Sequence, residues 1–243
     1  MLSKNQIKLI KSLSQKKYRK KQGLFVVEGK KGILEFLKSG YEVEMLFSTT
    51  NDLLEKQAVL ISEDDLKKIS FLVSPNEALA VFLIKETSNF EISEGLILAL
   101  DGIRDPGNLG TIIRLCDWFG VEDILCSEDT VDCYNPKVVQ ASMGSLARIR
   151  VSYLNLEDYL QKANMLTYGA FLEGENVYTS VLKEPSVLVM GNEANGISER
   201  IEALISEKIN IPQFGKSQST ESLNVATATS ILLSEFKRRP IER

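Results

Sequence analysis

Apolar and polar residues along this 243-residue chain follow two spacings, one typical of strands and one typical of helices. Continuous apolar runs at 96–100 and 187–190 predict strands that are covered on both faces. Near the end of the chain, Val225, Ala228 and Ile231 recur at the spacing of one helix face. We therefore expect an α/β protein whose last helix begins at about residue 222, with Thr220 or Ser222 capping its first turn.

The first third of the chain alternates short strand and helix patterns. The pattern predicts helices at 3–15, 30–39 and 63–69, strands at 24–27, 43–47, 58–61 and 78–84, and a basic loop at 16–23. Such alternation is typical of a small layered α/β domain. Residues 85–95 are polar and lack periodicity, so they are the candidate linker. We place one domain at 1–87 and the second at 88–243.

The second part continues the alternation of strand and helix. Expected strands cover 96–100, 124–127, 147–151, 166–170, 187–190 and 208–211, with helices at 106–119, 136–143, 156–163 and near Ser198. Strands separated by helices favour a mostly parallel sheet with helices on both faces.

Three glycine-bearing loops, at 101–110, 191–196 and 212–221, follow predicted strands. Ligands of open parallel sheets lie beyond the carboxyl ends of the strands, so these loops are candidates for one site. None has the G-x-G-x-x-G or G-x-x-x-x-G-K-[ST] spacing, which argues against a dinucleotide fingerprint and a P-loop. Asn108 is a plausible N-cap for the helix that follows the first loop.

Individual polar residues in these loops have structural as well as functional interpretations. Arg114 interrupts an apolar run and fits an exposed charge on the outer face of a helix. Glu193 fits a turn residue that bonds nearby amides. Small residues after Asn224 allow close approach of a ligand, and they also suit simple helix packing. The pattern alone leaves both interpretations open.

Charge is distributed unevenly along the chain. Residues 1–31 contain ten Lys or Arg and one acid, Glu28, whereas the remainder contains 19 basic and 32 acidic residues. A basic segment on an acidic body suggests contact with a polyanion. A solvated, lysine-rich first helix is the alternative. A transit peptide is disfavoured, because residues 1–21 hold a single arginine, Arg19.

The composition excludes several chemistries. The chain has no histidine, which removes the commonest general base and the commonest metal ligand, so we expect no metal site. Cys116, Cys126 and Cys133 have neither a metal-ligand spacing nor an even number for disulfides. No apolar run reaches the length of a membrane span, and no signal peptide is visible. We expect a cytoplasmic protein with reduced thiols.

Three segments form a set of motifs: PGNLGTIIR at 106–114, VMGNE at 189–193 and ESLNVA at 221–226. They resemble the three motifs of the SpoU (TrmH-type) RNA ribose 2′-O-methyltransferases, which belong to the SPOUT superfamily. In addition, KKYR at 16–19 and GLFVVEG at 23–29 resemble the RNA-binding front domain of many members, which is itself similar to a ribosomal protein. In this chain the loop before Ser222 is about three residues longer than the corresponding loop of the usual third motif. The extra residues are 217–219.

The resemblance implies a parallel catalytic sheet closed by a deep trefoil knot, and S-adenosyl-L-methionine bound in that knot. By position, it implies cofactor-binding roles for Gly191, Ile211 and Leu223. The implied catalytic residues are Asn108, Arg114, Glu193, Ser222 and Asn224. The implied RNA-binding residues of the basic segment are Lys16, Lys17, Arg19, Lys20 and Lys21.

The implied reaction is an in-line transfer of a methyl group to a ribose 2′-hydroxyl. Arg114 either takes the hydroxyl proton or holds the hydroxyl and an RNA phosphate in place. The front domain favours ribosomal RNA as the substrate, with transfer RNA as the alternative. A non-catalytic RNA-binding factor of ribosome assembly is the competing class. The family also implies a homodimer.

Overall fold

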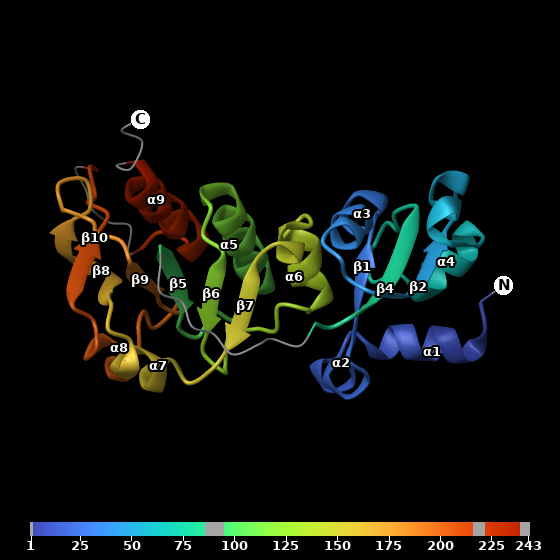
Figure 1. Ribbon diagram of the computed structural model, residues 1–243, viewed down its shortest axis with the longest axis horizontal. Helices are drawn as coiled ribbons and strands as arrows, with labels where there is room; N and C mark the ends of the chain where they lie inside the picture. The colour runs from blue at the N-terminus through green and yellow to red at the C-terminus, as the bar shows by residue number, and fades with distance from the viewer. Residues whose placement is uncertain (1, 86–94, 216–221, 239–243) are drawn as a thin grey trace. The chain divides into compact units, whose positions relative to one another are not determined.

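The computed structural model describes residues 2–85, 95–215 and 222–238, and it divides into two compact units (Figure 1). Unit 1 contains Met1–Glu86 together with Asp132–Arg148. Unit 2 contains Thr87–Val131 and Ile149–Arg243. A segment from the second half of the sequence, 132–148, is thus part of the N-terminal unit.

Unit 1 is built on a four-stranded mixed sheet with the order β1-β4-β2-β3. The central strand β4 (Ala78–Leu83) is antiparallel to both β1 (Leu24–Glu28) and β2 (Val43–Ser48). The short edge strand β3 (Val59–Leu60) runs parallel to β2. The helical elements of the unit are α1 (Lys4–Ser12), α2 (Lys16–Gln22), α3 (Lys30–Lys38), η1 (Asn51–Lys56), α4 (Glu63–Ile69), α6 (Pro136–Ala141) and η2 (Ser145–Ala147).

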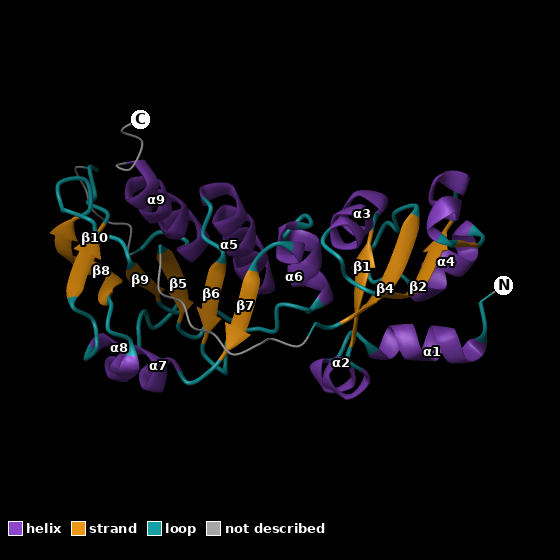
Figure 2. Cartoon of the chain, in the orientation of Figure 1, coloured by secondary structure: helices purple, strands orange, loops and turns teal. Residues whose placement is uncertain are grey.

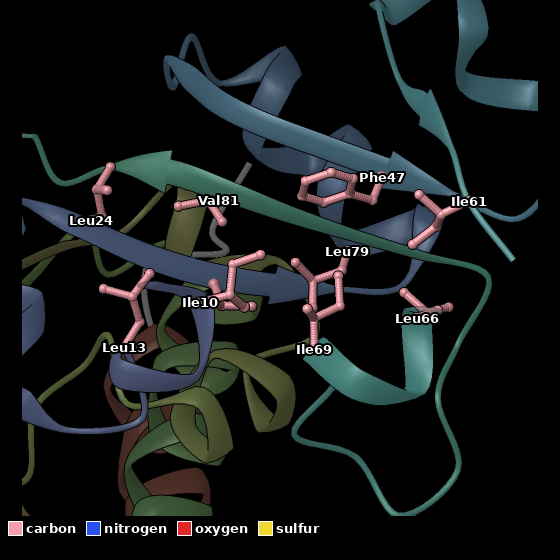
Figure 3. Packing of buried hydrophobic residues seen from close by; sticks show 10 residues of the cluster. Ile10, Leu13, Leu24, Phe47, Ile61, Leu66, Ile69, Leu79 and Val81 are labelled. Carbon is pink, nitrogen blue, oxygen red and sulfur yellow. The ribbon is translucent and has the colours of Figure 1, made fainter. Parts of the chain in front are cut away.

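Alternation along β1 sends its side chains into two apolar clusters. Leu24 and Val26 join a cluster with residues of α1 and α4, and Figure 3 shows these side chains gathered beside the sheet. Phe25, between them in sequence, packs instead with Phe36 and Tyr134, at ring-centroid distances of 5.3 and 4.5 Å. Both faces of the strand are therefore buried, which explains its unbroken apolar sequence.

Residues 16–22 form helix α2, so the predicted basic loop is wrong. The helix ends at Gly23, whose φ of 64° lies in the left-handed region that suits glycine. Arg19 is buried at 2% exposure, which gives this charged helix an attachment to the rest of unit 1. An amphipathic apolar stripe is absent from the KKYRKKQ sequence, and the helix was missed for that reason.

Unit 2 contains a six-stranded sheet with the order β10-β8-β9-β5-β6-β7 (Figure 2). Every described neighbouring pair of strands is parallel. The prediction of a mostly parallel sheet is confirmed. The strands are β5 (Leu96–Leu100), β6 (Asp123–Cys126), β7 (Arg150–Tyr153), β8 (Leu166–Asn176), β9 (Ser186–Met190) and β10 (Glu207–Asn210).

Helices cover both faces of this sheet, as the pattern predicted. Helices α5 (Pro106–Phe119) and α9 (Val225–Arg238) pack against each other. Figure 2 shows them on one side of the sheet, with α7 (Leu156–Lys162) and α8 (Glu199–Glu202) on the other. The central strands β5 and β9 are buried along their whole length.

Two boundaries in unit 2 differ from the prediction. The strand expected at 147–151 lies at 150–153, because residues 145–147 form a 3₁₀ turn after Gly144, whose φ is 92°. Strand β8 continues to Asn176 instead of ending near residue 170, and its far end pairs with β10 after a register shift. Thr220, the insertion at 217–219 and most of the expected linker lie outside the described residues. The knot stays a prediction.

None of the helices in the described ranges is long and apolar enough to cross a membrane.

Candidate active site

Loops from the two halves of unit 2 meet at one edge of its sheet. Because all the strand pairs are parallel, the carboxyl ends of β5, β9 and β10 lie at the same edge. The loop 101–105 follows β5, Gly191 follows β9, and Ile211 follows β10. This edge is where a parallel α/β sheet holds its ligands.

The start of α5 is set by Asp105, and the prediction that Asn108 caps this helix is wrong. Asp105 is the N-cap, and its Oδ1 accepts a hydrogen bond from the backbone N–H of Asn108 at 2.8 Å. Pro106 occupies the first helical turn, where a missing N–H costs nothing. An aspartate directly before a proline is a known start signal and could have located this cap. The side chain of Asn108 is consequently available for other contacts.

A chain of side-chain hydrogen bonds joins the three predicted motif segments. Asn108 Nδ2 donates to Glu193 Oε1 at 2.8 Å, and Asn224 Nδ2 donates to Asn108 Oδ1 at 2.9 Å. Asn224 Oδ1 in turn accepts from the backbone N–H groups of Ala226 and Thr227, at 3.0 and 3.3 Å, and so caps α9. Asn224 is the cap where the sequence suggested Thr220 or Ser222.

The order of donors and acceptors in this chain is fixed by its two ends. The Glu193 carboxylate only accepts when ionised, so Asn108 must present its NH₂ group to it. The Asn224 oxygen is already used by the helix N-terminus, so Asn224 must present its NH₂ group to Asn108. Each amide therefore has one orientation that satisfies every partner. The network holds three separate loops in one arrangement.

The loop after β9 is a tight turn that requires glycine at its first position. A Cβ on Gly191 would lie 2.1 Å from the carbonyl carbon of Gly196, which no side chain tolerates. Asn192 and Gly196 exchange two backbone hydrogen bonds, both of 2.9 Å. The Asn192 amide also donates to the Gly102 carbonyl at 2.6 Å, which links this turn to the loop after β5. Asn192 was not predicted from the sequence, although an asparagine in a tight turn is a usual sign of such bonding.

Arg114 lies on α5, six residues beyond Asn108, and its side chain is exposed. It makes no hydrogen bond or ion pair with any residue within the described ranges, and it is not part of the Asn108 network. One turn further along, Trp118 is 84% exposed, although it is the only tryptophan of the chain. This face of α5 thus presents a free cation and a large aromatic ring to solvent.

The three predicted cofactor residues lie at or beside this edge of the sheet. Gly191 and Ile211 are half-buried, and Leu223 is 47% exposed directly before Asn224. Ser222 is also exposed. Within the described residues, no group of three His, Cys, Asp or Glu side chains could hold a metal ion.

The predicted RNA-binding residues of α2 divide into two groups. Lys16, Lys17, Lys20 and Lys21 are exposed along the helix. Arg19 is not available to RNA, which corrects that part of the prediction. Its Nε donates to Asp132 Oδ2 at 2.9 Å, and its Nη1 donates to the carbonyls of Leu13 and Ser14 at 2.7 and 2.9 Å.

Comparison with known proteins identifies relatives of both parts of the chain. Residues 95–234 match the model of the SpoU rRNA Methylase family, and residues 4–80 match the MRM3-like substrate binding domain. The chain is 31% identical to the 23S rRNA (guanosine(2553)-2'-O)-methyltransferase RlmP of Bacillus subtilis, over 95% of this chain and 96% of that protein.

Two solved structures are similar over nearly the whole chain. A putative RNA methyltransferase of the TrmH family from Porphyromonas gingivalis shares 42% identity, with a TM-score of 0.89 over 98% of this chain and 99% of that one. An AdoMet-bound rRNA methyltransferase from Sinorhizobium meliloti shares 29% identity, with a TM-score of 0.88 over 100% of this chain and 97% of that one.

Proposed function

This chain belongs to the SpoU rRNA methylase family, and from that premise we propose that it transfers a methyl group from S-adenosyl-L-methionine to a ribose 2′-hydroxyl of ribosomal RNA. The observation that carries the proposal is the hydrogen-bonded chain Glu193–Asn108–Asn224. It joins the three motif segments of the family, although Asn108 lies 85 residues from Glu193 and 116 residues from Asn224 in the sequence.

The cofactor supplies an electrophilic methyl group when it is bound. Gly191, Ile211 and Leu223 would hold it, mainly through backbone groups at the carboxyl ends of β9 and β10. The fit is supported by the backbone packing at Gly191, where the chain approaches so closely that only glycine is accommodated. The AdoMet-bound relative from Sinorhizobium meliloti has the same fold. The proposed trefoil knot would form around this pocket.

In the proposed reaction, the ribose oxygen bonds to the methyl carbon while the carbon–sulfur bond breaks, and the hydroxyl proton leaves. The protein must align these atoms, because an in-line displacement is sensitive to geometry. We assign Arg114 to this alignment, since its guanidinium lacks a partner within the described residues and a guanidinium binds phosphate well. The proton would pass to the RNA phosphate or to water beside Arg114. Ser222 and Asn224 would shape the loop that receives the ribose.

In this proposal, unit 1 binds the RNA substrate. The exposed lysines of α2, Lys16, Lys17, Lys20 and Lys21, would contact phosphates and position the substrate without reading its sequence. Ribosomal RNA is the preferred substrate because the Bacillus subtilis relative is named for 23S rRNA and spans the same length. The proposal assigns RNA binding to residues 1–87 and the reaction to residues 88–243, although the segment 132–148 of the second part packs in unit 1.

We also infer that the protein acts in the cytoplasm as a homodimer. The exposed ring of Trp118 on α5 supports a contact with a second copy, because aromatic residues are enriched at protein–protein interfaces relative to the rest of the surface. Light scattering after size-exclusion chromatography tests the dimer. A Trp118→Glu variant should elute as a monomer, and a wild-type monomer at micromolar concentration would contradict the inference.

The activity is tested by incubating the protein with S-adenosyl-L-methionine labelled in its methyl group and with unmodified rRNA or tRNA. Alkaline digestion then locates the label, because a 2′-O-methyl group blocks cleavage at its own linkage. We expect label in an alkali-resistant dinucleotide from rRNA. If only tRNA is labelled, the substrate is tRNA and not rRNA. If the protein binds the cofactor but methylates neither RNA, the result favours a non-catalytic RNA-binding factor.

Arg114→Ala separates chemistry from folding. We expect this variant to lose methyl transfer while it still binds the cofactor, and Arg200→Ala, an exposed arginine on α8, to remain active. Full activity in Arg114→Ala would show that Arg114 is not needed to align the reacting groups.

A further inference from the structure

Unit 1 contains a hollow of about 420 Å³ that the proposed reaction does not use. It lies between the start of α3, the loop 75–77, and α6 with the turn that follows α6. Every residue that lines it belongs to unit 1. Its volume is within the range of small-molecule sites in proteins, about 300–1,000 Å³.

The lining combines an apolar floor with a polar rim. Val27, Phe36 and Val139 contribute buried apolar side chains. Asn76 and Gln140 contribute two carboxamides from segments about sixty residues apart in sequence. A carboxamide offers a donor and an acceptor side by side, which matches the edge of a nucleobase.

Two consecutive residues at the rim, Met143 and Gly144, have unusual backbone conformations with positive φ. Met143 has a φ of 53°, which is uncommon for a residue other than glycine, and its side chain is 51% exposed beside the hollow. The next residue, Gly144, has a φ of 92° and packs against the side chain of Glu35. Unusual backbone conformations of this kind concentrate at binding sites, where the fold must hold a residue in place.

The lining contains four charged residues, Glu28, Lys30, Lys31 and the exposed Glu77, and they are not equivalent. Glu28 is already satisfied, because its carboxylate accepts from the Ser70 hydroxyl and from the Phe71 N–H. Lys30 is paired with Asp52. Lys31 is exposed and makes no ion pair with any residue in the described part of the chain. The available cation at the hollow is therefore Lys31.

We propose that this hollow binds one unstacked nucleotide of the RNA substrate. The base enters between Met143 and the apolar floor, its edge meets the carboxamides of Asn76 and Gln140, and its phosphate lies near Lys31. RNA-binding proteins commonly read single-stranded bases in this way, by packing the ring and hydrogen-bonding its edge. The inference rests on the proposed function, because it takes the substrate to be RNA, and it gives unit 1 a base-reading role beyond phosphate contact.

The test uses the full-length protein with Asn76→Ala, Gln140→Ala and Lys31→Ala variants. Matched controls are Gln161→Ala, an exposed carboxamide on α7, and Lys38→Ala at the other end of α3. RNA affinity is measured by mobility shift, and kcat and KM by methyl transfer. We expect each hollow variant to weaken RNA binding and raise KM about tenfold, which corresponds to about 1.4 kcal/mol. We expect kcat, cofactor affinity and the thermal midpoint to stay unchanged.

Photochemical cross-linking provides a direct readout that does not require activity. Unmodified rRNA carrying 4-thiouridine should cross-link to the peptide that contains Met143, and Gln140→Ala should reduce this product. If the wild-type protein cross-links there but methylates no RNA, the proposed function fails while the hollow stands. If the three hollow variants bind RNA as the controls do, or if mononucleotides displace the cross-link as well as RNA does, the inference is overturned.

Discussion

Replacing Arg19 separates its structural role from the RNA contact that its sequence suggests. Arg19 stands among four lysines, and sequence alone would group it with them as a phosphate ligand. In unit 1 its guanidinium instead joins the carboxylate of Asp132 to the carbonyls of Leu13 and Ser14. We predict that Arg19→Ala destabilises unit 1, whereas Lys20→Ala, one residue away and exposed, does not.

The magnitude follows from the groups that Arg19 leaves behind. The Asp132 side chain is only 14% exposed, so its charge would remain largely buried without a partner. Removing one member of a buried ion pair costs about 3–5 kcal/mol of folding free energy. Substitutions of exposed residues usually change stability by less than about 0.5 kcal/mol. The two neighbouring variants should therefore differ by about 3 kcal/mol or more.

Arg19→Lys sharpens the test, because it keeps the charge and loses the geometry. A lysine ammonium cannot reproduce the planar fork that reaches a carboxylate and two carbonyls together. We expect it to lose about 2 kcal/mol, since hydrogen bonds to charged groups contribute about 1.5–3 kcal/mol each. If Arg19 were a phosphate ligand, the lysine variant would retain both stability and RNA affinity.

Urea unfolding followed by circular dichroism gives the stability of each variant. Hydrogen exchange measured on peptides covering 16–28 and 132–148 shows where the loss occurs. We expect faster exchange in both peptides for Arg19→Ala. The reasoning is refuted if Arg19→Ala unfolds at the wild-type urea concentration and only its RNA affinity falls.

Three further outcomes are expected. Asn224→Asp should keep the cap of α9 but lower kcat at least about tenfold, because two carboxylates would then face Asn108, which can turn its NH₂ group to only one of them; methyl-transfer kinetics and thermal unfolding measure the two effects, and an unchanged kcat would contradict the network's role. Gly191→Ala should abolish cofactor binding in calorimetry while Gly215→Ala, whose Cβ would meet open space, retains it. Burial raises the pKa of Tyr134, so the stability due to its neutral phenol is complete below about pH 10 and is lost as the pH rises further; a urea midpoint that stays constant from pH 9 to 11 would count against this.

Local patterns predicted the elements well where burial itself produces the pattern. The apolar run of β5 and the helix α4 lie where the sequence placed them, because strands covered on both faces and helices with a cap and an apolar stripe leave clear signals. Helix α2 left none, since what holds it is one buried arginine whose partner is 113 residues away. Sequence spacing carries no information about such a distant ion pair.

The sequence predicted which residues form the candidate site, but it did not predict the hydrogen bonds between them. The three motifs supplied Asn108, Glu193 and Asn224, but the chain of hydrogen bonds between them depends on three loops meeting in space. The capping roles of Asp105 and Asn224 were assigned to their neighbours for the same reason. Asn108 lies three residues from Asp105, and Thr220 and Ser222 lie four and two residues from Asn224. Only the folded backbone decides which side chain reaches the free N–H groups.

The membership of residues 132–148 in unit 1 means that the chain passes between the two units three times. A cut after residue 87 would therefore leave an incomplete N-terminal piece, with Asp132 missing from Arg19 and Tyr134 missing from Phe25. Residues 1–87 therefore cannot be exchanged between proteins as an independent domain. Any recombination or engineering that replaces it has to carry the partner segment from the second half of the gene, so the two parts of this protein are constrained to change together.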